Sequence, residues 1–158
     1  MSKFEKRKLI FEWASKHDEN HLHLFEENSV FNKRNAIQRI TIFADIFENS
    51  IYLLLANIQG VDTPIYVGKS KRPFARWKQH ISGFESGKAT YSKWRGLLVN
   101  GNDVLNFDVK LLIVPERKIL FPPISDFPIT IGAVEYQLVS LISDAFPETL
   151  LNSEGNRR

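Results

Sequence analysis

The chain has 158 residues, and its composition excludes several classes of protein before any motif is considered. Hydrophobic residues make up 43% and charged residues 25%, which excludes a disordered or collagen-like chain. Cysteine is absent, so disulfides, thiolate zinc sites and cysteine nucleophiles are excluded as well. No segment has the apolar length of a signal peptide or a bilayer span, and we expect a soluble, cytoplasmic protein with no membrane partner.

Positive charge is concentrated in one part of the chain. The formal net charge is only +3, yet residues 66–95 contain eight cations against Glu85 alone. Aromatic residues are interleaved with these cations, a pattern typical of surfaces that bind a phosphate backbone. The alternative is a solvated basic face above aromatic residues of the core. The candidate nucleic-acid contacts in this block are Lys71, Arg72, Lys78, Lys88, Lys93 and Arg95.

Two helices are expected before residue 50, at about residues 4–16 and 35–47, because apolar residues recur there at spacings of three and four. The polar segment between them, residues 17–34, is expected to be an exposed loop. Its three histidines, His17, His21 and His23, lack the cysteine or carboxylate partners of a metal site. Residues 1–49 are therefore expected to form a helical N-terminal extension.

The rest of the chain, residues 50–158, is expected to form an α+β core. Residues 51–57 and 64–67 predict two strands of an antiparallel hairpin, and residues 105–114 predict a third strand. These give a small three-stranded antiparallel sheet flanked by helices.

Three helices are expected in this core. The first begins at Pro73 and ends at Gly83, because proline suits the first turn and glycine the position after the last. The second covers about residues 91–99. The third, residues 131–145, follows a proline-rich loop and is expected to be capped by Thr130.

Glu135 has an unusual position in the third of these helices. It shares a face with Leu138, Val139 and Ile142. An ionised carboxylate on an apolar face needs a partner, a proton or a bound cation. Two interpretations stay open: a glutamate at the edge of the stripe whose head reaches water, or a single carboxylate that binds Mg²⁺.

Arg72, Arg76 and His80 are spaced by four and so share one side of the first core helix. The arginine fork matches phosphate oxygens, and histidine can transfer a proton near neutral pH. The alternative is a solvated basic stripe.

Tyr52 and Tyr66 fall on the two strands of the expected hairpin, where tyrosine commonly serves packing. A phenol needs a nearby cation or base before it can accept a proton, because its reference pKa is about 10. Lys69, three residues after Tyr66, is placed to supply that charge.

Taken together, these residues resemble the motifs of the GIY-YIG nuclease superfamily. The first motif corresponds to residues 50–52, Ser-Ile-Tyr, with Ser in place of the usual Gly, and the second to residues 66–68, Tyr-Val-Gly. The family's arginine lies ten residues beyond the second tyrosine, at Arg76. Its glutamate lies on a later helix, and a proline and an asparagine follow it. The corresponding residues here are Glu135, Pro147 and Asn152.

The resemblance spans residues 50–152, about two-thirds of the chain. His80, four residues after Arg76, is similar to the variant found in compact type II restriction endonucleases of this superfamily. The resemblance implies sequence-specific hydrolysis of double-stranded DNA that depends on Mg²⁺, with Mn²⁺ as a substitute. Because one active site cuts one strand, a two-fold homodimer is expected, formed through the N-terminal helices or the proline-rich loop.

The resemblance also implies a role for each site residue. Glu135 would bind the metal, Arg76 would neutralise charge on the phosphate, and Tyr66 would position the phosphate. Tyr52 would orient or deprotonate the attacking water with help from Lys69 or His80, and any of these three could be the base. Asn152 would hold the metal site or the substrate by hydrogen bonds. The alternative functions are a repair, mobile-element or RNA nuclease, or a non-catalytic nucleic-acid-binding module.

Overall fold

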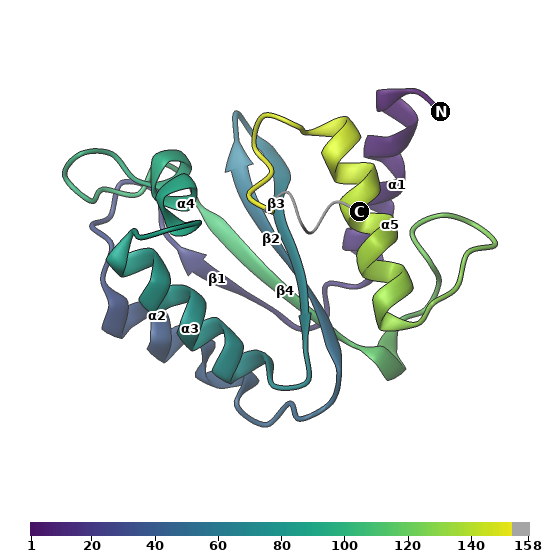
Figure 1. The fold of residues 1–158 in the computed structure, drawn as a ribbon, viewed down its shortest axis with the longest axis horizontal. Coiled ribbons are helices and arrows are strands. Elements are labelled where there is room, and N and C mark those ends of the chain that lie inside the picture. The colour runs from purple at the N-terminus through teal and green to yellow at the C-terminus, as the bar shows by residue number, and fades with distance from the viewer. Residues whose placement is uncertain (153–158) are drawn as a thin grey trace.

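An antiparallel sheet carries the fold, and helices cover both of its faces (Figure 1). The computed structural model describes residues 1–152. In chain order the elements are α1 (Lys3–Lys16), β1 (His21–Phe25), α2 (Lys33–Ile40), the 3-10 turn η1 (Thr41–Phe43), β2 (Ser50–Ile58), β3 (Val61–Ser70), α3 (Pro73–Ser86), α4 (Tyr91–Leu98), β4 (Val109–Pro115), the 3-10 turn η2 (Glu116–Lys118) and α5 (Ile131–Ala145). The class is therefore α+β, as predicted.

The sheet has four strands in the order β1-β4-β2-β3, and the prediction of three strands was wrong. The additional strand is β1, which lies in the segment expected to be loop and pairs antiparallel with β4. Five residues of alternating histidine and leucine are too few for periodicity to separate a strand from a loop. The segment before residue 50 is therefore not purely helical. The division of the chain at residue 50 itself stays a prediction.

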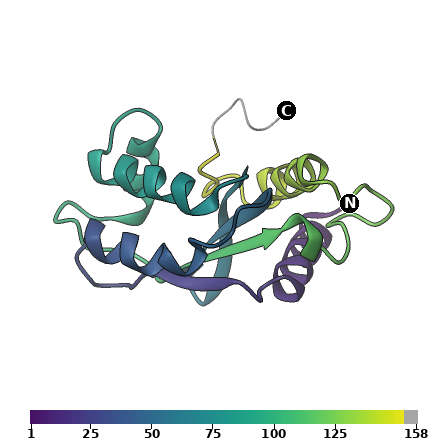
Figure 2. The ribbon, with the colours of Figure 1, turned by 90° about the horizontal axis from the view of Figure 1, so that it is seen from below.

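The side chains of β2 alternate between two hydrophobic cores. Tyr52 and Leu54 belong to the core covered by α2, α3 and α4, whereas Ile51 and Leu53 belong to the core covered by α1 and α5. Figures 1 and 2 show these two groups of helices on either side of the strands. Because both faces are covered, the first seven residues of β2 are all buried, and Ser50 is followed by a continuous run of aliphatic and aromatic residues.

β3 lies at one edge of the sheet, and the end of the described chain covers part of that edge. The backbone N–H of Leu151 donates to the carbonyl of Ile65 at 2.6 Å. The β2–β3 pairing shifts register between Leu54 and Leu55, which lets Ile65 and Tyr66 both join the core under α3.

α3 extends one turn beyond its predicted end at Gly83. Gly83 lies inside the helix, and Gly87, with φ of 67° in the left-handed region, terminates it. Arg72 is the N-cap residue and so lies outside the helix that carries Arg76 and His80. Of the elements in residues 1–152, no helix combines the length and the apolar character that a bilayer span requires.

α5 has the predicted bounds, but a different residue caps it. Thr130 is the N-cap residue, yet its side chain makes no capping hydrogen bond. The Glu116 carboxylate in η2 accepts a hydrogen bond from the backbone N–H of Ile131 at 3.0 Å. A negative charge here also complements the helix dipole. η2 therefore helps to fix the start of the helix that carries Glu135.

We expect Glu116→Ala to lower the free energy of unfolding by about 1 kcal/mol, because the first turn of α5 loses its cap. In a domain of this size the melting temperature should fall by about 2–4 °C. Glu148→Ala, which removes an exposed carboxylate after α5, is the matched control and should leave the melting temperature unchanged. Equal melting temperatures for Glu116→Ala and the native protein would show that this contact does not stabilise α5.

Candidate active site

Tyr52 and Tyr66 lie on the same face of the β2–β3 hairpin. Tyr52 is opposite Gly68 and Tyr66 is opposite Leu54, so the two rings are diagonal neighbours. Their ring centroids are 6.1 Å apart, and both residues are buried, with Tyr52 2% and Tyr66 8% exposed. A methyl group at Gly68 would lie within 2.6 Å of the Tyr52 hydroxyl oxygen and would overlap the ring. The glycine of the second motif thus makes room for the tyrosine of the first.

Arg76 and His80 reach this face from consecutive turns of α3. The Arg76 guanidinium donates a hydrogen bond to Gln79 Oε1 at 3.0 Å, and it acts on the Tyr52 hydroxyl through both charge and hydrogen bonding. His80 is 2% exposed, with its ring centroid 5.3 Å from Tyr66. α3 therefore brings a fixed cation and an imidazole to the two phenols.

Burial raises the pKa of both tyrosines, and the upward shift is large for Tyr66. Arg76 opposes this effect at both residues, and only at Tyr52 does it also act by hydrogen bonding. Glu135 raises the pKa of both phenols through its charge. Both hydroxyls are therefore protonated near neutral pH, and Tyr52 is the easier of the two to deprotonate.

Burial, together with the charge of Arg76, lowers the pKa of His80 to about 3. The ring is therefore neutral at physiological pH. Its Nδ1 atom is 2.9 Å from the Tyr91 hydroxyl oxygen, whereas its Nε2 atom is buried and has no hydrogen-bond partner among residues 1–152. A histidine with so low a pKa is a weak proton acceptor, which disfavours His80 as the general base.

Lys69 and Glu135 approach from the other face of the sheet. Lys69 is opposite Ile51, which places it on the side covered by α5. Its Nζ atom is 3.3 Å from Glu135 Oε1. The Glu135 side chain is 27% exposed and pairs with Lys69, so its head group reaches the surface, and binding of Mg²⁺ stays a prediction.

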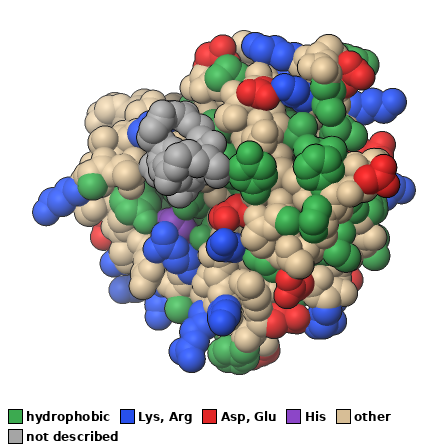
Figure 3. Space-filling model, turned by 45° about the vertical axis from the view of Figure 1, so that its right-hand side comes forward, with side chains coloured by type: hydrophobic (Ala, Val, Ile, Leu, Met, Phe, Trp, Pro, Cys, Tyr) green, Lys and Arg blue, Asp and Glu red, His purple; other side chains and the backbone are tan. Residues whose placement is uncertain are grey.

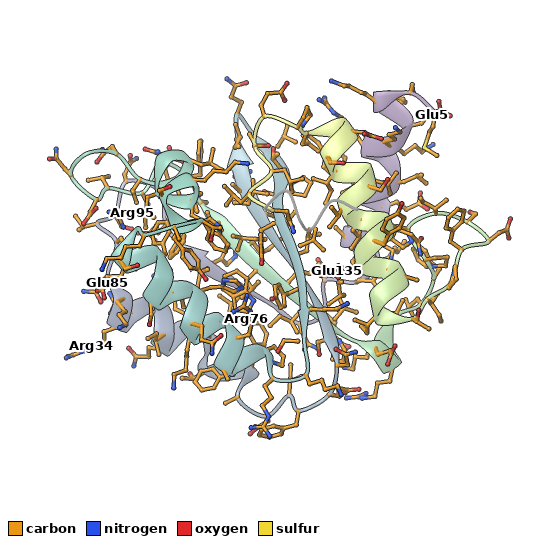
Figure 4. The ribbon with its side chains drawn as sticks, in the orientation of Figure 1. Glu5, Arg34, Arg76, Glu85, Arg95 and Glu135 are labelled. Atoms are coloured by element: carbon orange, nitrogen blue, oxygen red, sulfur yellow. The ribbon has the colours of Figure 1, made fainter. Side chains whose placement is uncertain are left out.

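The predicted site residues therefore surround the β3 edge of the sheet. Arg76 comes from α3 and Glu135 from α5, on either side of the β2–β3 hairpin (Figure 4). α3 and α5 flank this edge in both ribbon views (Figures 1 and 2). Two phenols and a guanidinium lie on one face of this edge, and an ammonium group and a carboxylate lie on the other.

A cavity of about 260 Å³ opens beside Tyr66, Arg76 and His80, whereas Tyr52, Lys69 and Glu135 do not line it. It is lined by Tyr66, Arg76, His80, Thr90, Tyr91, Trp94 and Leu151. Such a set of donors suits an oxyanion. The sequence did not single out Tyr91, because Gly83, the glycine that accommodates its ring, was interpreted as the end of the helix. A larger hollow of about 680 Å³ near η1 and η2 contains none of the predicted catalytic residues.

Asn152 holds the backbone of β3. It is 1% exposed, its Oδ1 atom accepts a hydrogen bond from the N–H of Val67 at 3.0 Å, and its Nδ2 atom donates to the carbonyl of Val67 at 2.8 Å. The structure thus pairs Asn152 with the residue between Tyr66 and Gly68, and not with Glu135 or Arg76. Its contacts give it a positioning role for the second motif.

Most of the predicted nucleic-acid contacts are exposed, and Arg95 differs from the others. Arg95 forms an ion pair with Asp103, donates to the carbonyl of Phe84 at 2.9 Å and lies over the Phe84 ring. Its guanidinium therefore helps to hold α4 against α3. The exposed cations are Lys71, Arg72, Lys78, Lys88 and Lys93. Figure 3 shows Lys and Arg side chains gathered on the lower left of one face, around a recess in which a histidine is visible.

Of the three N-terminal histidines, His21 and His23 are exposed as expected, but His17 is buried. Its Nδ1 atom lies 2.7 Å from the carbonyl oxygen of Trp13, and its Nε2 atom accepts from the N–H of Leu120 at 2.9 Å. His17 thus links α1 to the proline-rich loop. Among residues 1–152, no group of three or more His, Cys, Asp or Glu side chains is placed to hold a metal ion.

Comparisons of the chain with known protein families, with curated protein sequences and with solved structures find no match. The interpretation of the site therefore depends on the chemistry of its own residues.

We expect Asn152→Ala to lower the free energy of unfolding by roughly 2 kcal/mol, because the buried N–H and carbonyl of Val67 lose their partners. Urea denaturation measures the loss, and hydrogen exchange at the Val67 amide should become faster. Asn102→Ala, in an exposed turn, is the matched control. Unchanged stability and unchanged exchange at Val67 would contradict the positioning role.

The low pKa of His80 predicts a pH dependence of stability. Between about pH 6.5 and pH 3 the unfolded chain binds a proton at this residue that the folded chain does not. The free energy of unfolding should therefore fall as the pH falls through this window, by up to about 1.4 kcal/mol per pH unit. His80→Gln should show a shallower fall in urea denaturation between pH 7 and pH 4.5.

His23→Gln, at an exposed position of β1, is the control and should keep the native slope. NMR of the native protein should find the His80 imidazole neutral at pH 5. An imidazolium signal from His80 at that pH would contradict the prediction.

Proposed function

We propose that this protein is a GIY-YIG-type endonuclease that hydrolyses phosphodiester bonds of double-stranded DNA at specific sequences, like the compact type II restriction enzymes of that superfamily. The observation that carries the proposal is that Tyr52 and Tyr66 stack on the β2–β3 hairpin, with Arg76 of α3 and Glu135 of α5 on either side of it. The tyrosines lie on a hairpin, the arginine on the next helix and the glutamate on a later helix, in the order of the sequence motifs.

Hydrolysis of a phosphodiester makes three demands on a site. The attacking water must be oriented, the charge that develops on the phosphate must be neutralised, and the leaving oxygen must be stabilised. Arg76 is a fixed cation beside both phenols and lines the cavity, so it meets the second demand. Tyr66 reaches the same cavity and is placed to position the phosphate by a hydrogen bond.

Tyr52 is the best supported of the three candidates for orienting the water. Lys69 is paired with Glu135, and the low pKa of His80 makes it a weak base. The protonated Tyr52 hydroxyl can accept a hydrogen bond from water, and Arg76 beside it favours loss of the phenol proton. In this proposal Lys69 balances the negative charge of the Glu135 carboxylate.

The residues present fit a Mg²⁺ ion held by one carboxylate. Magnesium sites that act on phosphates use one or two carboxylates and complete the coordination with water and phosphate oxygens. Glu135 offers such a carboxylate, and it already binds one cation, the ammonium group of Lys69. When bound, the ion would supply Lewis-acid stabilisation of the leaving oxygen. Mn²⁺ has similar preferences and would substitute for it.

The partner in this proposal is double-stranded DNA. The exposed cations of residues 71–93 would contact its phosphates: Lys71, Arg72, Lys78, Lys88 and Lys93. One site cuts one strand, so a double-strand cut is most simply made by a two-fold homodimer. Sedimentation of the free and DNA-bound protein measures this assembly.

We expect Glu135→Gln and Arg76→Ala to lower the rate of plasmid cleavage in Mg²⁺ by at least about a hundredfold, because each removes a charge from the reacting centre. Both variants should keep the native circular dichroism spectrum. Glu148→Gln, at an exposed carboxylate beyond the end of α5, is the matched control and should cleave normally. Either site variant cleaving at the native rate would refute the assignment.

The products separate the alternative functions. Discrete ends on sequencing support a restriction-type enzyme, whereas random nicks favour a repair or mobile-element nuclease. Cleavage of RNA in preference to plasmid would indicate an RNA nuclease. Binding of DNA without cleavage in Mg²⁺ or Mn²⁺ would indicate a non-catalytic module.

A further inference from the structure

His80 has a polar contact that the proposed reaction does not yet use. Its Nδ1 atom is 2.9 Å from the hydroxyl oxygen of Tyr91, at the start of α4. Trp94 stacks on one face of the ring, with the two ring centroids 5.1 Å apart. Within the described chain Nε2 has no partner. Tyr91 therefore controls the hydrogen bonding of His80 from outside α3.

The position of Tyr91 is built into the packing of α4 on α3. Its ring lies against Gly83, where a methyl group would overlap the ring carbons. Gly83 follows His80 by three residues and so lies on the same side of α3. Glycine inside a helix destabilises it by up to about 1 kcal/mol relative to alanine. Gly83 therefore destabilises α3 slightly but leaves the space that the Tyr91 ring occupies.

The chemistry of the two groups sets the direction of their hydrogen bond. A phenol is a stronger acid than a neutral imidazole N–H, and an imidazole nitrogen is a better acceptor than a phenol oxygen. Burial also raises the pKa of Tyr91, which keeps the proton on the hydroxyl. The Tyr91 hydroxyl therefore donates to Nδ1 of His80, and the hydrogen of the neutral ring is on Nε2.

We propose that Tyr91 is a positioning residue that holds His80 in its Nε2–H form, so that His80 donates a hydrogen bond to a phosphate oxygen. This inference rests on the proposed phosphodiester hydrolysis. A buried N–H without a partner is unfavourable, and His80 and Tyr91 both line the cavity that Arg76 makes attractive to an anion. A phosphate oxygen entering that cavity is the acceptor that completes the arrangement.

Tyr91→Phe tests the proposal, because it keeps the ring against Gly83 and removes only the hydroxyl. In the native protein ¹⁵N NMR should show Nδ1 of His80 as an acceptor and Nε2 as protonated. The variant should lose this preference and show a mixture of tautomers. Titration with inorganic phosphate should shift the Nε2–H signal of the native protein more than that of the variant. Tyr136→Phe, an exposed tyrosine of α5, should behave like the native protein in both measurements.

Plasmid cleavage provides a second readout. Tyr91→Phe should lower kcat roughly tenfold with little change in KM, the equivalent of one hydrogen bond made in the transition state. A hydrogen on Nδ1 in the native protein, no response of Nε2–H to phosphate, or native kcat in the variant would each overturn the proposal. A native protein that shows the expected tautomer but cleaves neither DNA nor RNA would refute the proposed hydrolysis instead.

Discussion

The contact between the Tyr52 ring and the backbone of Gly68 is the constraint on which the arrangement of the site depends. Because residue 68 has no side chain, a phenol on β2 can lie across β3 and bring its hydroxyl to the edge of the sheet. Any larger residue at this position would push the ring away from the strand. The stack with Tyr66 and the contact with Arg76 both require the ring to be where the glycine lets it lie.

Enclosure by aromatic rings gives the polar groups of the site their electrostatic character. Desolvation holds protons on the phenols and removes charge from His80, while Arg76 remains cationic. An anion entering such a site meets a fixed positive charge and neutral donors in a poorly solvated environment, where electrostatic interactions are stronger than in water. Charge near the phosphate would thus come from Arg76 and not from a protonated histidine.

The parts of the fold that the sequence predicted are those with long or strongly patterned segments. The hairpin and α5 were predicted because their apolar runs extend over enough residues to be distinguished from loop. β1 was missed because five residues carry too little pattern. The end of α3 was placed at Gly83 because a glycine commonly stops a helix, and only the neighbouring α4 shows that its role is to accommodate Tyr91.

The candidate site was predicted less completely than the fold, because contacts between distant segments decide it. The spacing of the motifs selected Tyr52, Tyr66, Arg76 and Glu135 as candidates, but no spacing reveals that Tyr91 contacts His80. Nor does it reveal that the Asn152 amide pairs with the backbone of Val67. Both contacts form between elements that approach only when the sheet and its helices are assembled.

The ion pair between Lys69 and Glu135 relates the fold to the proposed use of a metal ion. The two side chains come from the edge strand and from the helix beyond it, and they are 48% and 27% exposed. An ion pair that is this accessible to water is weak. A divalent cation brings twice the charge and can share phosphate oxygens, so it would compete effectively for the carboxylate. Lys69 would then be free to turn toward the phosphate.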